Sequence, residues 1–213
     1  MPQPELHIDA HTALIVVDVQ NDFLPGGALA VTQGDDVIPV INRIAPRFQN
    51  VVITQDWHPA GHLSFASSHP GYDHYQHIDM PYGPQCLWPD HCVQGSTGAE
   101  LAESLAIPHA RLILRKGIHR DIDSYSAFLE ADRTTPTGLL AWLQAQHIQQ
   151  VVIVGLATDF CVAWTAIDAA QAGLVTWVME DACRAIDIDG SLHQATTTMK
   201  EAGVTIVTSC SLH

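Results

Sequence analysis

The sequence predicts an α/β protein: a single domain of three layers (α/β/α) around a central six-stranded, mainly parallel sheet. Short apolar runs rich in β-branched residues recur along the chain, as in strands that a sheet buries on both faces. Helical patterns lie between several of these runs, and such alternation gives parallel βαβ units with right-handed crossovers. The chain has 213 residues, 47% of them hydrophobic, which is enough for one full core.

The individual elements follow from these runs in chain order. The apolar runs predict strands at 12–18, 50–55, 111–115, 151–155, 174–179 and 204–208. The first four carry the sequences ALIVVD, VVITQD, RLILRK and VVIVGLATDFC. Helical patterns (DVIPVINRIAPRF, PTGLLAWLQAQH, CVAWTAIDAAQA and GSLHQATTTMKEA) predict helices at 36–48, 136–147, 161–172 and 190–202. No internal repeat, low-complexity tract or linker interrupts the pattern, so we expect one domain over residues 1–213.

Residues 57–100 do not follow this pattern, because they are rich in Pro, Gly, aromatic residues and His without clean periodicity. Six of the 13 histidines of the chain fall in this segment. Long segments of this kind within compact domains are usually functional or disordered, and a high aromatic content supports packing. We therefore expect an ordered excursion that covers the functional edge of the sheet.

Charge and cysteine content limit the classes of partner and compartment. The 9 Lys and Arg residues against 23 Asp and Glu residues give a net charge of −14, which disfavours nucleic acid and anionic membranes. We therefore expect a small neutral or cationic ligand. No stretch is long enough to span a bilayer, and the N-terminus lacks the basic region of a signal peptide. Five cysteines, an odd number, indicate reduced thiols and a cytoplasmic location.

Four chemically capable residues lie at the ends of predicted strands: Asp18, Asp56, Lys116 and Cys161. In open α/β sheets, ligands bind in the crevice outside the carboxyl ends of the strands. An acid, a metal-ligand type of acid, a base and a thiol should therefore converge on one edge of the sheet. This pattern predicts an enzyme before any family is considered.

Cys161 is the strongest candidate for a nucleophile. It follows the strand VVIVG and begins a predicted helix, whose free N–H groups lower a thiol pKa and can hold an oxyanion. A nearby cation such as Lys116 would favour the thiolate further. The alternative is a small buried apolar residue, the usual environment of a cysteine, and we expect that environment for Cys86, Cys183 and Cys210.

Asp18 and Lys116 each have an ordinary alternative role. A carboxylate directly after a buried strand is costly unless it is paired or works in a site, yet Asp18 could instead cap the following turn together with Asp22. Lys116 could be a solvated charge on a loop. Its neighbour Arg115 should point in the opposite direction, because side chains alternate along a strand.

The segment Asp56-x-His58 places two types of metal ligand on one side of an extended segment. With His91 from LWPDHC as the third ligand, they would form a metal site with positions left open for substrate or water. One carboxylate and two imidazoles suit Zn²⁺ or Fe²⁺, with Mn²⁺ as a further option. His62, Ser64 or water could supply a fourth ligand. The alternative is a set of surface histidines on a polar loop.

Six motifs in the same order resemble those of the nicotinamidases, a branch of the isochorismatase-like cysteine hydrolase superfamily. They are DVQNDF, DWHP, LWPDHC, RKG, SYSAF and GLATDFCV, and they run from about residue 18 to residue 161. GLATDFCV is typical of the superfamily, whereas DWHP and WPDHC add the metal site of the nicotinamidase branch.

The resemblance implies a role for each matching residue. It implies a catalytic triad of Asp18, Lys116 and Cys161, metal ligands Asp56, His58 and His91, a ring pocket with Phe23, Trp88 and Tyr125, and an oxyanion hole from the N–H groups of Ala157 and Cys161. It also implies a cis peptide bond before Ala157. The implied cofactor is one divalent metal ion that binds the substrate ring.

The implied reaction is hydrolysis of nicotinamide to nicotinate and ammonia through a cysteine thioester, which feeds NAD salvage, with pyrazinamide as a further substrate. Three alternatives stay open: another hydrolase of the superfamily, such as a carbamoyl or ureido amidase or isochorismatase; a non-catalytic binding domain; and a zinc hydrolase that uses bound hydroxide. The metal ligands argue against most of the first group, and Cys161 argues against isochorismatase. The pattern leaves a homo-oligomer open.

Overall fold

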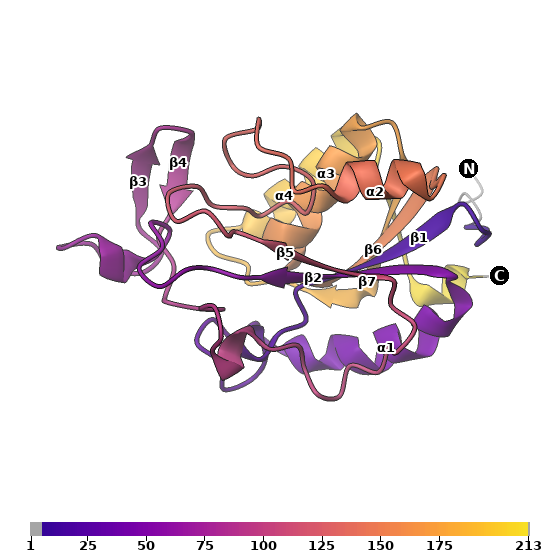
Figure 1. Ribbon diagram of the computed structural model, residues 1–213, viewed down its shortest axis with the longest axis horizontal. Helices are drawn as coiled ribbons and strands as arrows, with labels where there is room; N and C mark the ends of the chain where they lie inside the picture. Colours follow the sequence, from indigo (N-terminus) through magenta and orange to yellow (C-terminus); the bar gives the residue numbers. More distant parts are fainter. Residues whose placement is uncertain (1–5, 213) are drawn as a thin grey trace.

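A computed structural model describes residues 6–212, and a six-stranded sheet forms its centre (Figure 1). The strands lie in the order β5-β2-β1-β6-β7-β8, and every neighbouring pair is parallel. Their bounds are β1 (Thr12–Val17), β2 (Asn50–Asp56), β5 (Leu112–Lys116), β6 (Gln150–Leu156), β7 (Val175–Arg184) and β8 (Thr205–Val207). The prediction of a six-stranded, mainly parallel sheet is therefore confirmed.

Helices cover both faces of this sheet, which gives the three predicted layers (Figure 1). The helices are α1 (Val37–Ile44) on one face, and α2 (Leu139–Ala145), α3 (Ala163–Gln171) and α4 (Ser191–Glu201) on the other. All four lie within the ranges that the helical patterns predicted. The real helices are shorter because α1 gives way to a 3-10 turn that contains Pro46, and α2 begins only after Gly138, whose φ is +97°.

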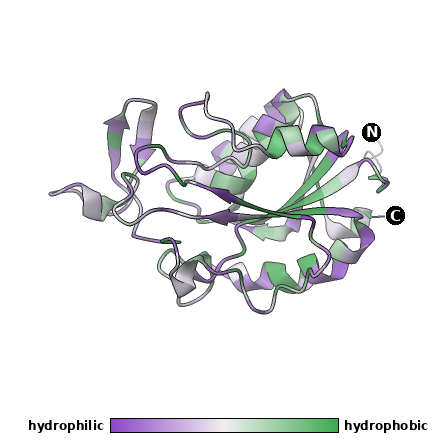
Figure 2. Ribbon diagram, in the orientation of Figure 1, coloured by the Kyte–Doolittle hydropathy of each residue, from purple (hydrophilic) through white to green (hydrophobic). Residues whose placement is uncertain are grey.

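Alternate residues of the central strands enter two separate cores. Leu14 and Val16 of β1 pack with Ile41 of α1, whereas Ala13 and Ile15 of β1 pack on the side of α2 and α3. The cause is the period of two along a strand, which sends successive side chains to opposite faces. Figure 2 shows that hydrophobic residues are concentrated along the central strands. Strands buried on both faces explain why the apolar runs are almost continuous.

The excursion at 57–100 extends beyond the carboxyl ends of the central strands (Figure 1). It contains an antiparallel hairpin of β3 (His77–Met80) and β4 (Gly83–Cys86), together with short 3-10 turns. Phe65 and Leu87 within it are fully buried. The segment is therefore packed against the body of the protein, as its aromatic content predicted.

Two general features of the chain complete the fold. Within residues 6–212, no helix combines the length and the apolar character that a membrane crossing requires. All five cysteines are free thiols; four are buried and Cys210 is exposed. The expectation of a buried position was therefore wrong for Cys210, because it lies in the 3-10 turn Ser209–Ser211 after the last strand and outside the packed faces of the sheet.

Candidate active site

The parallel sheet brings the four strand-end residues together around one cation. Lys116 Nζ lies 2.9 Å from Asp18 Oδ2 and 3.3 Å from Cys161 Sγ, and it also pairs with Asp56 Oδ1. It donates a further hydrogen bond of 2.8 Å to the carbonyl of Ser124. Lys116 is only 1% exposed, which excludes the role of a solvated loop charge. The guanidinium of Arg115 stacks instead on the ring of Trp57, on the opposite side of the strand.

Asp18 does not cap a turn; it faces Lys116. The chain bends directly after β1, at Asp18, where φ is +50°. Thr54 Oγ1 donates a hydrogen bond of 2.5 Å to Asp18 Oδ1, while Asp18 Oδ2 accepts no hydrogen bond within residues 6–212 and faces the ammonium group. Burial raises the pKa of Asp18, and the charge of Lys116 opposes this rise. A carboxylate of raised pKa is a better proton acceptor than an ordinary one.

Cys161 lies within a π-helical turn, Thr158–Val162, that connects β6 to α3. Burial raises the pKa of its thiol well above the usual value; Lys116 lowers it, and the charges of Asp18 and Asp56 raise it. The helix terminus and Lys116 favour the thiolate, but burial and the two carboxylates outweigh them, so the thiol keeps its proton in the resting site. A protonated thiol needs a base before it can attack, and Asp18 is the carboxylate placed beside it.

Asp56, His58 and His91 form a compact cluster of metal-ligand atoms. Asp56 Oδ2 lies 3.7 Å from His58 Nε2 and 3.9 Å from His91 Nε2. His58 Nδ1 donates to the carbonyl of Gly117 at 3.0 Å, and His91 Nδ1 donates to the carbonyl of Pro89 at 2.8 Å. These bonds fix the tautomer in which each Nε2 keeps its lone pair for a ligand.

The donor set fits a divalent metal ion. Two imidazole lone pairs and one carboxylate oxygen converge without a proton donor between them, which is the arrangement that a Zn²⁺ or Fe²⁺ ion satisfies. Gly117 contributes to the position of His58: its φ is +64°, and an added Cβ would overlap the His58 ring. A glycine at this turn therefore lets the ring lie against the backbone.

His62 is close to this cluster but is already hydrogen-bonded at both ring nitrogens. Its ring centroid lies 4.4 Å from that of His58. His62 Nδ1 accepts from the N–H of Ser64 at 3.1 Å, and its Nε2 donates toward the carbonyls of His119 and Ile122 at 2.9 and 3.2 Å. These hydrogen bonds would have to break before His62 could ligate a metal.

A small aromatic cavity joins the thiol to the metal-ligand cluster. The residues lining it are Phe23, Leu29, Asp56, Trp88, His91, Asp123, Tyr125, Ala157, Phe160, Cys161 and Ile186. Trp88 Nε1 donates to the hydroxyl of Tyr125 at 2.9 Å, and the ring of Phe160 meets that of Trp88 edge-on. The peptide bond between Leu156 and Ala157 is cis. The three predicted ring-pocket residues and both predicted oxyanion residues therefore lie on one cavity.

Several lining residues were not predicted from the sequence. Phe160 directly precedes Cys161, and Asp123 directly precedes SYSAF, so both could have been found by inspecting motif neighbours. Asp123 is held by Gln85 Nε2 at 2.7 Å and by the N–H of Ser124 at 2.8 Å. Other lining residues, such as Ile186, come from loops that carry no motif.

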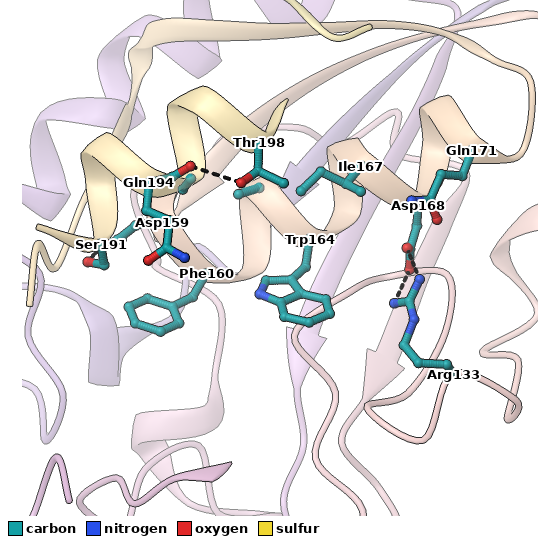
Figure 3. Close-up of a pocket in the computed structure, with 12 residues that line it drawn as sticks. Arg133, Asp159, Phe160, Trp164, Ile167, Asp168, Gln171, Ser191, Gln194 and Thr198 are labelled. Carbon is teal, nitrogen blue, oxygen red and sulfur yellow. Dashed lines mark hydrogen bonds and ion pairs between the residues drawn. The ribbon is translucent and has the colours of Figure 1, made fainter. Parts of the chain in front are cut away.

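A larger cavity of about 570 Å³ lies between α3 and α4, on the outer side of Phe160 (Figure 3). Phe160 and Trp164 are neighbours along its wall because they are four residues apart. Arg133 and Asp168 form an ion pair at one end. None of the triad candidates or metal-ligand candidates lines this cavity, so we assign the chemistry to the smaller one.

The chain belongs to the isochorismatase family, because the isochorismatase domain matches residues 12–211. Within this family, the chain is similar to proteins named nicotinamidase or pyrazinamidase. The chain is 59% identical over 197 residues to a nicotinamidase of Acinetobacter baylyi, covering 92% of each chain. A nicotinamidase and pyrazinamidase structure from Acinetobacter baumanii is 55% identical, covers 95% of this chain and 98% of its own, and has a TM-score of 0.94. A pyrazinamidase structure from Pyrococcus horikoshii in complex with zinc is 35% identical, covers 93% and 99%, and has a TM-score of 0.76.

Proposed function

We propose that this protein is an amidase that hydrolyses nicotinamide to nicotinate and ammonia, feeds NAD salvage and also deamidates pyrazinamide. The relatives named nicotinamidase support the substrate. The observation that carries the chemistry is the position of Lys116 Nζ between Asp18 and Cys161, beside an aromatic cavity. Cys161 lines this cavity, and Lys116 links its thiol to the carboxylate of Asp18, so a nucleophile and a base are both in place for amide hydrolysis.

The first half of the reaction makes a thioester. Asp18 takes the proton of the Cys161 thiol, and the thiolate attacks the carboxamide carbon. Lys116 stabilises the ion pair that forms, because its pKa is raised by the two carboxylates and it stays charged. The N–H groups of Ala157 and Cys161 hold the oxyanion, and the loss of one such donor costs about 3–4 kcal/mol.

The second half releases both products. Protonated Asp18 gives its proton to the departing ammonia and leaves the acyl group on Cys161. Water, deprotonated by Asp18, then attacks the thioester carbon, and nicotinate leaves as the thiol is restored. Phe23, Trp88 and Tyr125 hold the ring during both steps.

Asp56, His58 and His91 would hold one divalent metal ion, Zn²⁺ or Fe²⁺, with Mn²⁺ as a further option. When bound, this ion supplies a Lewis acid for the pyridine nitrogen. The side chains of the triad then act on the carboxamide at the other end of the ring. The structure of a relative in complex with zinc supports a divalent metal in this family.

The remaining parts of the proposal concern the chain as a whole. We propose one domain over residues 1–213, with the metal-site excursion at about 57–100. The free thiols support a cytoplasmic location. The small cavity supports a small-molecule substrate, and a homo-oligomer stays a prediction.

The test is ammonia release from nicotinamide by the wild type, Cys161→Ala and the control Cys183→Ala, each before and after chelation and zinc addition. Cys183 is also buried but lies outside the aromatic cavity. We expect turnover that Cys161→Ala abolishes, that Cys183→Ala keeps, and that chelation weakens chiefly through KM. Turnover that survives in Cys161→Ala would favour metal-bound hydroxide, and wild-type inactivity on nicotinamide would favour carbamoyl substrates or a binding domain.

A further inference from the structure

The side chain of Gln20 replaces a missing strand partner beside Asp56. The β1–β2 ladder ends at the pair Val16 and Ile53, because the chain bends at Asp18. β2 continues to Asp56, whose backbone N–H and carbonyl then have no partner from β1. Gln20 Oε1 accepts from the Asp56 N–H at 2.8 Å, and Gln20 Nε2 donates to the Asp56 carbonyl at 2.8 Å.

This contact specifies an uncharged amide. Gln20 is 0% exposed, and its Nε2 donates a second hydrogen bond of 2.9 Å to the carbonyl of Ala99. The side chain must therefore present one acceptor to an N–H and two donors to two carbonyls, which is the full donor set of an amide nitrogen. Buried backbone groups without partners are costly, so the contact holds both peptide groups that flank the Cα of Asp56.

The position of the Asp56 backbone determines where the two oxygens of its carboxylate lie, and each oxygen has a different partner. One oxygen, Oδ1, pairs with Lys116, and the other, Oδ2, faces His58 and His91. A small rotation of the residue would move Oδ2 away from the two imidazoles. Groups that orient a ligand without touching the ion commonly change metal affinity 10- to 100-fold when they are removed.

We propose that Gln20 is a positioning residue for the metal site: its amide fixes the backbone of Asp56 and thereby holds the carboxylate toward His58 and His91. This inference rests on the proposed metal site. It assigns to Gln20 no contact with the substrate, the thiol or the ion.

Gln55 provides a matched control. It is also buried, and its Nε2 donates to the same carbonyl of Ala99, at 3.1 Å. Gln55→Met removes one donor to Ala99 and leaves both hydrogen bonds between Gln20 and Asp56 in place. Gln20→Met removes a donor to Ala99 and the two bonds to Asp56 as well. The difference between the two variants therefore isolates the contact with Asp56.

The experiment measures the zinc dissociation constant by competition with a chromophoric chelator for the wild type, Gln20→Met and Gln55→Met. We expect Gln20→Met to weaken zinc binding about 10- to 100-fold, and Gln55→Met to stay within about twofold of the wild type. We also expect excess zinc to restore most of the nicotinamide turnover of Gln20→Met, which a general loss of structure would not allow. If Gln20→Met does not fold, Gln20→Asn serves instead, because its shorter side chain stays polar and uncharged but cannot reach both backbone groups of Asp56, and the same loss of zinc affinity is expected.

Two results would overturn the inference while leaving the metal site intact. One is a Gln20→Met variant that binds zinc as tightly as the wild type. The other is an equal loss of affinity in Gln55→Met, which would place the effect at Ala99. A wild-type protein that binds no zinc would overturn the proposed metal site itself and this inference with it.

Discussion

Replacing Lys116 with methionine should destabilise the protein strongly, because one buried ammonium group balances two buried carboxylates. Lys116 Nζ lies 2.9 Å from Asp18 Oδ2 and also pairs with Asp56 Oδ1, and all three side chains are buried. Removing one partner of a buried ion pair costs about 3–5 kcal/mol, because a charge is left without compensation. In a chain of this size each kcal/mol lowers Tm by about 2–4 °C, so we expect a fall of about 6–20 °C.

The loss of stability in Lys116→Met should depend on pH, in a direction that the pKa of Asp18 sets. Burial already raises the pKa of Asp18 in the wild type, and loss of Lys116 raises it further. A carboxyl group whose pKa is higher in the folded than in the unfolded protein destabilises the fold at pH values above its folded pKa, where it is ionised. This penalty disappears as the pH falls and the group takes up its proton. The deficit of Lys116→Met should therefore be largest at neutral pH and should shrink in acid, relative to the wild type.

The assay is urea and thermal unfolding of metal-free protein at pH 7, followed by circular dichroism. Arg115→Met is the control, since it removes a cation one residue away that is exposed and stacks on Trp57, and it should cost less than about 1 kcal/mol. Adding Asp18→Asn to Lys116→Met should recover part of the loss, because it removes one of the uncompensated charges. A deficit no larger than that of Arg115→Met, or no recovery in the double variant, would refute the electrostatic explanation.

Two further expectations test other parts of the structure. Cys210 is the one exposed thiol among the five cysteines, and burial raises the pKa of Cys86 to about 12. Ellman's reagent at pH 8 should therefore react quickly with a single thiol, and Cys210→Ser should remove that reaction. Two or more fast-reacting thiols would contradict the burial of the other four cysteines. Gly98→Ala should lower the free energy of unfolding, measured in urea, by about 1–3 kcal/mol, because an added Cβ would overlap the carboxylate of Asp22. A variant as stable as the wild type would show that the structure relaxes to relieve this overlap.

The central strands β1, β2 and β6 could be predicted because each is buried on both faces and is therefore an apolar run with a single interpretation. The ends of the helices were less certain, since a turn can continue a helical pattern: the predicted helix at 136–147 begins at Leu139 only because Gly138 adopts a positive φ. The groups that raise the pKa of Cys161 could not be predicted, for a different reason. A helix terminus is a local feature of the sequence, whereas the burial and the carboxylates of Asp18 and Asp56 come from strands far apart in the chain.

Gln20 shows where prediction from motifs stops. Asp56, His58 and His91 could be found because metal chemistry requires their residue types, and a sequence displays residue types directly. The role of Gln20 depends on where the β1–β2 ladder ends, which is set by the bend at Asp18 and not by any chemistry of the amide itself. A glutamine in DVQNDF therefore carries no visible signal, even though its amide makes both hydrogen bonds to the backbone of Asp56. Residues that hold a site in place become identifiable only when the backbone groups they satisfy are known.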